Sequence, residues 1–111
     1  MKEFLFSYGT LQNERVQLDL FSRILTGTTD ILKGYKILTI EIKEESFLSK
    51  SSQRYYSIAI NSSKKEDCIT GAVFEISKKE LRIADKYEPD EYKRVKVKLE
   101  SGKQAWVYVS A

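Results

Sequence analysis

Two carboxylates, Asp85 and Glu88, stand on a predicted helix where a charged side chain is costly. The helix begins at Ser77, because Ser77 and Glu80 have the spacing of a capping box. Leu81, Asp85 and Glu88 fall at i, i+4 and i+7, so they share one face, and Leu81 turns that face toward the core. Burying an ionised carboxylate is expensive unless it is paired or hydrogen-bonded. The two carboxylates therefore have either a chemical role or a structural one.

Glu88 should lie at the end of this helix, since Pro89 disfavours the α conformation for the residue before it. A carboxylate in that position is partly buried and still reachable by a small molecule, so it could accept and donate protons. In the alternative interpretation, Asp85 and Glu88 only pair with Arg94 or a nearby lysine, or the helix turns both toward water. The helix by itself leaves these roles open.

The composition removes most other catalytic chemistry. The 111 residues include no histidine and one cysteine, Cys68. Without histidine there is no serine–histidine or cysteine–histidine nucleophile, so carboxylates must do any acid–base work. Transition-metal ligands are too few for a metal site, and no phosphate-binding loop with its lysine occurs. A magnesium site made of carboxylates stays open, although the adjacent Glu44 and Glu45 are typical of a solvated loop.

The length predicts a single domain over residues 1–111. No apolar stretch reaches the length of a membrane span, and the N-terminal residues do not resemble a secretory leader, so we expect a cytoplasmic protein with no membrane partner. The single cysteine agrees with a reducing compartment. No feature of the sequence indicates an oligomeric state.

The hydrophobic periodicity predicts an α+β fold, with a small mixed six-stranded, barrel-like sheet and two flanking helices. The polar stretches 44–53 and 61–67 are typical of loops. Gly27 is placed to cap the first helix. The predicted strands are residues 3–8, 31–42, 54–60, 69–76, 92–99 and 104–110, and the predicted helices are residues 13–25 and 77–88.

The first strand ends in Tyr8-Gly9-Thr10-Leu11, directly before the first helix. Gly9 lets the backbone turn sharply, and successive amide groups at such a turn can form a concave site for an anion. The same tripeptide is also common in ordinary turns, so the loop alone does not predict binding.

The hairpin near the C-terminus carries a second group of polar and aromatic residues. Tyr92 and Arg94 fall on one face of their strand, and Trp106 and Tyr108 share a face of the next strand. These side chains could line a pocket. They could equally stabilise the sheet as cross-strand pairs, with the arginine stacked on an aromatic ring.

Several of these motifs occur in one order along the chain, and together they resemble the gamma-glutamylcyclotransferase-like family, whose members include gamma-glutamylamine cyclotransferases and the plant AIG2-like proteins. The resemblance covers nearly the whole chain, and residues 41–67 match loosely. The motifs are Tyr8-Gly9-Thr10-Leu11, Gly71-Ala72-Val73-Phe74-Glu75-Ile76, Asp85-Lys86-Tyr87-Glu88 followed by Glu91-Tyr92-Lys93-Arg94, and Ala105-Trp106-Val107-Tyr108-Val109.

The resemblance implies a small mixed barrel and one glutamate that acts as general acid and base, which matches Glu88. It also implies that a small-molecule substrate with a gamma-glutamyl group is converted to 5-oxoproline and a free amine, with no metal or organic cofactor. The family's loop amides hold the polar end of the substrate, which maps onto residues 8–11. Two positions depart from the family pattern: Pro89 stands where a glycine often follows the glutamate, and Tyr56-Ser57 stands where tyrosine-proline is common.

Two other classes of function compete with this one. A pI near 8.9 and the strip Arg94, Lys96 and Lys98 beside Tyr92 would suit an oligonucleotide-binding barrel. The net charge is only +3 and acidic residues surround the strip, so a solvated sheet face explains it better and we expect no nucleic-acid partner. The other class is a non-catalytic binding or regulatory module of the same fold, which Pro89 makes a real alternative.

Overall fold

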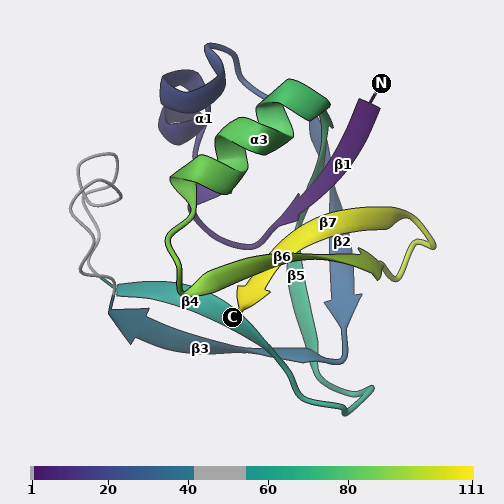
Figure 1. Ribbon diagram of the computed structural model, residues 1–111. Coiled ribbons are helices and arrows are strands. Elements are labelled where there is room, and N and C mark those ends of the chain that lie inside the picture. Colours follow the sequence, from purple (N-terminus) through teal and green to yellow (C-terminus); the bar gives the residue numbers. More distant parts are fainter. Residues whose placement is uncertain (1, 42–54) are drawn as a thin grey trace.

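A computed structural model describes residues 2–41 and 55–111 of the chain. These residues form seven strands and two α-helices (Figure 1). The elements are β1 (Lys2–Ser7), a 3-10 turn η1 (Thr10–Gln12), α1 (Glu14–Phe21), β2 (Gly27–Lys33), β3 (Tyr35–Glu41), β4 (Tyr55–Asn61), β5 (Cys68–Ser77), α3 (Lys78–Tyr87), β6 (Tyr92–Lys98) and β7 (Gln104–Ser110).

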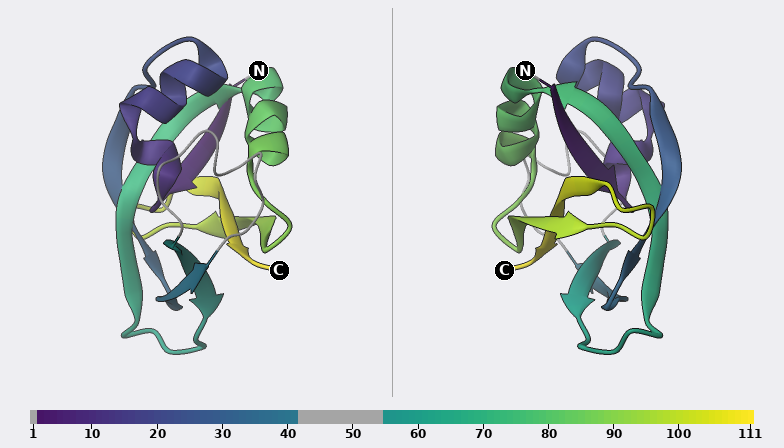
Figure 2. Two further views of the ribbon diagram at one scale, coloured as in Figure 1. Left: turned by 90° about the vertical axis from the view of Figure 1, so that its left-hand side faces the viewer. Right: turned by 90° about the vertical axis from the view of Figure 1, so that its right-hand side faces the viewer.

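Five strands form one sheet in the order β2-β5-β1-β7-β6, and β3 and β4 form a separate two-stranded sheet. Every pair is antiparallel except β1 and β7, which makes the large sheet mixed. The edge-on views show a strongly curved sheet, with α1 and α3 beside each other at one end of the molecule and the β3–β4 hairpin at the other (Figure 2). The predicted α+β class with two flanking helices is confirmed.

Both faces of β1 are covered, which makes it the central strand of the fold. Leu5 packs in a core cluster beneath the helices, with Leu81 and Ala84 of α3. Phe6, on the opposite face, packs in a second cluster with Val107 of β7. Because successive side chains of a strand point to opposite faces, a strand with both faces covered is apolar at successive positions. This explains why two apolar residues, Leu5 and Phe6, stand side by side in β1 and are both buried.

The predicted strand over residues 31–42 is wrong, because the chain turns in its middle. Gly34 has φ of +83° and separates β2 from β3. Its amide donates to the carbonyl of Asp67 at 2.8 Å, and its carbonyl accepts from the amide of Ser62 at 2.9 Å. The strand-like residues on either side of Gly34 hide this turn in the sequence. The described residues therefore contain seven strands, where the pattern predicted six.

The first helix is also shorter than predicted. It ends at Phe21, because Ser22 adopts the left-handed conformation and its amide bonds to the carbonyl of Leu18. The buried side chain of Gln17 then accepts from the amide of Leu25 at 2.8 Å, and this bond holds the chain after the helix in a non-helical path. Gly27 is not a cap; it is the first residue of β2.

The second helix matches its prediction. Ser77 caps α3, and both bonds of the capping box to Glu80 are present. Glu88, directly after the helix, has an extended backbone (φ −71°, ψ 132°), as expected for a residue before proline. The C-terminal end of α3 points toward the starts of β4 and β6 (Figure 1). No helix in the described residues has the length and apolar character needed to cross a membrane.

Candidate active site

Glu88 occupies the junction between α3 and the segment that leads to β6. Its amide closes the last turn of the helix on the carbonyl of Ala84 at 3.0 Å, so the start of its side chain is fixed by the helix. The side chain is half-buried. Within the described residues its carboxylate forms no ion pair and no hydrogen bond. An acid group in this setting is available for chemistry.

The surroundings of Glu88 favour its protonated form. Burial raises the pKa of Glu88 to about 8, and the negative charge of Asp85 adds to this effect. Burial also raises the pKa of four tyrosine hydroxyls, and the charge of Glu88 contributes at each. These tyrosines come from the loop after β1, from α3, from β6 and from β7, so four separate elements surround the carboxylate. They are Tyr8, Tyr87, Tyr92 and Tyr108.

Asp85, one helical turn before Glu88, is fully engaged. It accepts from Nε of Arg94 at 2.8 Å, from Nη2 of Arg94 at 3.1 Å, and from the hydroxyl of Tyr108 at 2.7 Å. The guanidinium of Arg94 also stacks on the ring of Trp106, 4.2 Å from its centroid. The sequence left open whether both carboxylates only pair with Arg94. In the structure Asp85 pairs with Arg94 and has a structural role, whereas Glu88 does not pair with it.

Replacing Asp85 by Asn should lower the pKa of Glu88. The substitution removes a negative charge one turn away and leaves the positive charge of Arg94 less compensated, and both changes favour the ionised form of Glu88. Burial remains the main cause of the shift, so the pKa should stay above its ordinary value of 4.5. The measurement is an NMR titration of the Glu88 carboxyl carbon. An unchanged midpoint in Asp85→Asn, or an equal shift in Asp19→Asn on the exposed side of α1, would contradict this account.

The loop after β1 lies against the C-terminal end of α3, which carries Glu88, and presents backbone amides. The amide of Gly9 makes only a long contact of 3.4 Å to Oγ of Ser7, and within the described part of the chain the amides of Thr10 and Leu11 bond to nothing. A Cβ at Gly9 would meet no atom within 4 Å, so the space beside it is open. Thr10 Oγ1 lies 3.0 Å from the hydroxyl of Tyr87, the residue before Glu88, and this bond ties the loop to α3.

The hydroxyl protons of three candidate binding residues are already donated within the protein. Tyr8 donates to the carbonyl of Tyr108 at 2.6 Å, Tyr92 donates to the carbonyl of Ser57 at 2.8 Å, and Tyr108 donates to Asp85. Their rings surround Glu88, but none of these hydroxyls has a proton left for a ligand. The sequence pattern predicted that these three tyrosines lie near the site, but it gave no information on the groups that their hydroxyls bind.

The comparisons with known proteins identify the family. The family model described as gamma-glutamyl cyclotransferase, AIG2-like, matches residues 5–111. The chain belongs to this family.

Solved structures with the same fold agree with this assignment. A protein from Arabidopsis thaliana has 20% identity and a TM-score of 0.76, over 99% of this chain and 62% of its own. A protein described as gamma-glutamyl cyclotransferase has 18% identity and a TM-score of 0.73, over 100% of this chain and 68% of its own. An AIG2-like protein from Mus musculus has 22% identity and a TM-score of 0.63, over 99% of this chain and 78% of its own. At these identities the structures show the fold alone.

The chain, a member of the gamma-glutamyl cyclotransferase family, spans 62% and 68% of the length of the first two of these structures. A search of curated proteins gave no match.

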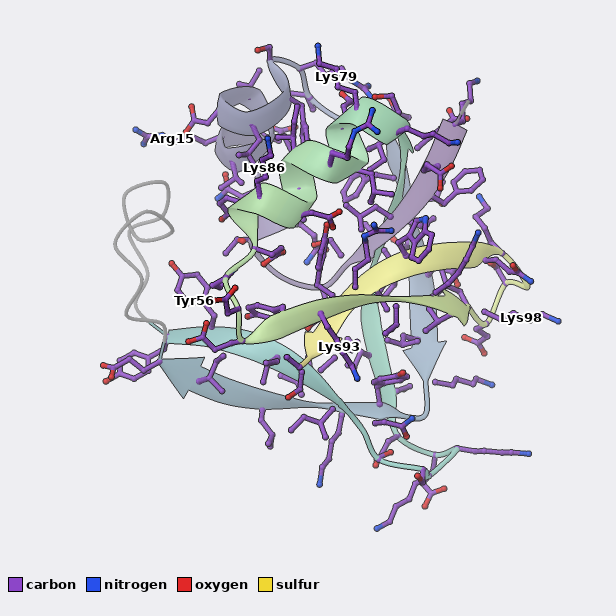
Figure 3. The ribbon with its side chains drawn as sticks, viewed as in Figure 1. Arg15, Tyr56, Lys79, Lys86, Lys93 and Lys98 are labelled. Carbon is purple, nitrogen blue, oxygen red and sulfur yellow. The ribbon has the colours of Figure 1, made fainter. Side chains whose placement is uncertain are left out.

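Two aromatic residues of the site were not singled out from the sequence of this family member. Tyr87 precedes Glu88 and bonds to Thr10, and Tyr56 is buried at the start of β4. Tyr56 lies below the C-terminal end of α3, whereas Lys79 and Lys86 lie on the outer surface of that helix (Figure 3). The sequence signals for them were the motif that joins Tyr87 to Glu88 and the position of Tyr56-Ser57 where the family commonly has tyrosine-proline. Trp106, in contrast, donates its Nε1 proton to Glu3 at 2.8 Å and serves to stack Arg94.

No group of three or more potential metal ligands occurs in residues 2–41 and 55–111. Glu44 and Glu45, considered above for magnesium, lie outside the described residues.

Proposed function

We propose that this chain is an enzyme that converts a small gamma-glutamyl amide or amine derivative to 5-oxoproline and a free amine, with Glu88 as general acid and base. Membership of the gamma-glutamyl cyclotransferase family supports the general class of reaction. The single observation that carries the proposal is Glu88 itself: a half-buried carboxyl group without an ion-pair partner in the described residues, with a pKa raised to about 8, beside a loop with free amides.

The raised pKa suits the proton transfer that this reaction needs. The α-ammonium of the substrate must lose a proton before its nitrogen can attack the γ-carbonyl carbon. An amine is a much stronger base than an ordinary glutamate, which is therefore too weak a base by several pKa units. A carboxyl group with a pKa of about 8 lies much closer to an amine in proton affinity, so proton transfer in either direction is less uphill.

The steps balance with Glu88 as the only titrating group. The ionised carboxylate takes the proton from the α-ammonium, the nitrogen forms a bond to the γ-carbon, and a five-membered ring closes. The bond from the γ-carbon to the leaving nitrogen then breaks as Glu88 returns its proton to that nitrogen. The ring nitrogen still carries one proton more than 5-oxoproline keeps, so the carboxylate takes that proton as well and passes it to the free amine, which leaves as an ammonium ion. Because the attacking group and the carbonyl belong to one molecule, the enzyme has only to hold a folded conformation of the substrate.

The loop after β1 would hold the charged end of the substrate. The free amides of Gly9, Thr10 and Leu11 can donate to the α-carboxylate or to the oxyanion that forms at the γ-carbon. Donation to the oxyanion is the role that accelerates the reaction, since that charge develops only in the transition state. In this proposal the rings of Tyr8, Tyr92 and Tyr108 form the walls of the site, with Arg94 behind them.

A panel of gamma-glutamyl compounds tests the proposal. We expect 5-oxoproline to be released from at least one member that combines a free α-amino group with a gamma-glutamyl amide to an amino acid, a dipeptide or an alkylamine. Turnover should survive exhaustive chelation. Saturable binding of a panel member by calorimetry, without release of 5-oxoproline, would instead indicate a non-catalytic module.

A further inference from the structure

The seam between β4 and the five-stranded sheet is held by side chains. In the described residues β4 pairs only with β3, and no backbone hydrogen bond joins it to β6 or β7. A cavity of about 310 Å³ lies along this seam, lined by Ala59 and Ile60 of β4, Lys93 and Val95 of β6 and Val109 of β7. Figure 3 shows Lys93 over the space between β6 and the β3–β4 hairpin. Although β4 and β7 are neighbours, no backbone ladder forms between them along the cavity.

Two tyrosine hydroxyls cross this seam near Glu88. The hydroxyl of Tyr8 accepts from the amide of Ala59 at 2.9 Å and donates to the carbonyl of Tyr108 in β7 at 2.6 Å. The hydroxyl of Tyr92 donates to the carbonyl of Ser57 at 2.8 Å. Ala59 is fully buried, so its amide has no access to water if the hydroxyl is removed.

The backbone groups that are bridged have a specific spacing. The carbonyl of residue 57 and the amide of residue 59 point to the same edge of β4, the edge away from β3. In a parallel ladder one residue of the neighbouring strand would bind both groups, with its amide on the carbonyl and its carbonyl on the amide. Here the hydroxyls of Tyr92 and Tyr8 take those two places. They bind the edge of β4 as a neighbouring strand would.

We infer that Tyr8 and Tyr92 are positioning residues, which join β4 to the five-stranded sheet in place of a backbone ladder and thereby fix the loop after β1 and the start of β4 around Glu88. The expected effect on turnover rests on the proposed function. The structural bridge between β4 and the five-stranded sheet rests on the contacts alone. Tyr8 begins the loop with the free amides, and β4 carries Tyr56, which is buried at the site. A displacement of β4 relative to the five-stranded sheet would therefore move both the loop after β1 and Tyr56.

Hydrogen exchange and kinetics of Tyr8→Phe test this inference. Without substrate, the amide of Ala59 should exchange at least ~10-fold faster, because its acceptor is lost, while the amide of Ile58, which faces β3, keeps its rate. In the same variant kcat should fall ~10-fold or more with KM within about twofold, since a misplaced site loses rate more than binding. Tyr55→Phe, on the same strand with 61% of Tyr55 exposed, is the matched control and should change neither quantity.

Tyr92→Phe provides the second variant. The Tyr92 hydroxyl binds Ser57 and not the amide of Ala59, yet its loss should also speed exchange at Ala59, because it loosens the same edge of β4. If Tyr8→Phe does not fold, the exchange rate and the kinetics of Tyr92→Phe still test the inference.

Three results would overturn the inference. The first is unchanged exchange at Ala59 in the folded variants, most clearly with a raised KM, because the hydroxyls would then bind substrate. The second is faster exchange with unchanged kcat, which would remove the positioning role. The third is an effect of equal size in Tyr55→Phe. The exchange measurement uses no substrate, so it decides the structural bridge even if the parent protein releases no 5-oxoproline and the proposed function fails.

Discussion

Replacing Glu88 by Gln should lower turnover by roughly 10²–10⁴, the usual scale for the loss of a positioned proton-transfer group, while KM stays within a few-fold. Glutamine keeps the shape of the side chain, and the backbone bond from residue 88 to Ala84 is unaffected. The variant loses only the ability to carry a proton between the two nitrogen atoms of the substrate. The measurement is 5-oxoproline release from the best substrate of the panel.

The control for charge is Glu66→Gln, in an exposed turn outside the site, and its rate should equal that of the parent. The kcat/KM of the parent should rise with pH and level off above about 8, as Glu88 ionises in the free enzyme. A parental rate in Glu88→Gln would remove Glu88 from the mechanism.

The same variant should be more stable than the parent at high pH and equal to it at low pH. An unfolded Glu88 ionises at its ordinary value near 4.5, whereas the folded group keeps its proton until a pKa of about 8. The parent thus loses stability as the pH rises from 4.5 to 8, since only the unfolded state gains the charge freely. Thermal melts should show no difference near pH 4 and a growing one up to pH 8. A variant that melts below the parent at pH 8 would indicate a structural carboxylate.

Gly71→Ala should have the largest effect on folding. A Cβ at this position would lie 2.4 Å from the carbonyl oxygen of Ser7 and 2.8 Å from Cζ of Phe6. The oxygen belongs to the backbone of β1, so it cannot move without shifting the strand pair formed by β1 and β5. Overpacking of a core usually costs about 1–3 kcal/mol, and here the backbone itself must yield, so we expect the upper end of that range or more.

For a chain of this size the melting temperature should fall by roughly 10 °C or more. Any folded fraction should also lose kcat/KM, because Ser7 directly precedes the loop that begins at Tyr8. Thr70→Ala, on the exposed face of the same strand, is the control and should melt within a few degrees of the parent. A Gly71→Ala protein with parental melting and turnover would show that the strands can separate freely at this point.

Local chemistry in the sequence determined the parts of the protein that depend on near neighbours. Ser77 and Glu80 specified the start of α3, and Pro89 specified its end, because capping bonds and the steric limits before proline act within a few residues. Glu88 was placed at the helix end for the same reason. The motif at residues 8–11 and its companions indicated the family, which the family model confirms over residues 5–111.

Only the tertiary structure decided which groups are partnered. Arg94, nine residues from Asp85, takes that carboxylate and leaves Glu88 without it. The hydroxyl of Tyr8 reaches the amide of Ala59, 51 residues away, and the carbonyl of Tyr108, 100 residues away.

The turn at Gly34 was hidden for a related reason, because it depends on bonds to Ser62 and Asp67, which lie far along the chain. The early end of α1 depends on nearer residues, Ser22 and the side chain of Gln17, whose bonds hydrophobic periodicity does not report. Periodicity reports which face of an element is buried, and it carries no information on which strand will lie opposite. The pKa of Glu88 therefore could not be read from its place on a helix. It is set by burial among residues that the fold brings together from four separate elements.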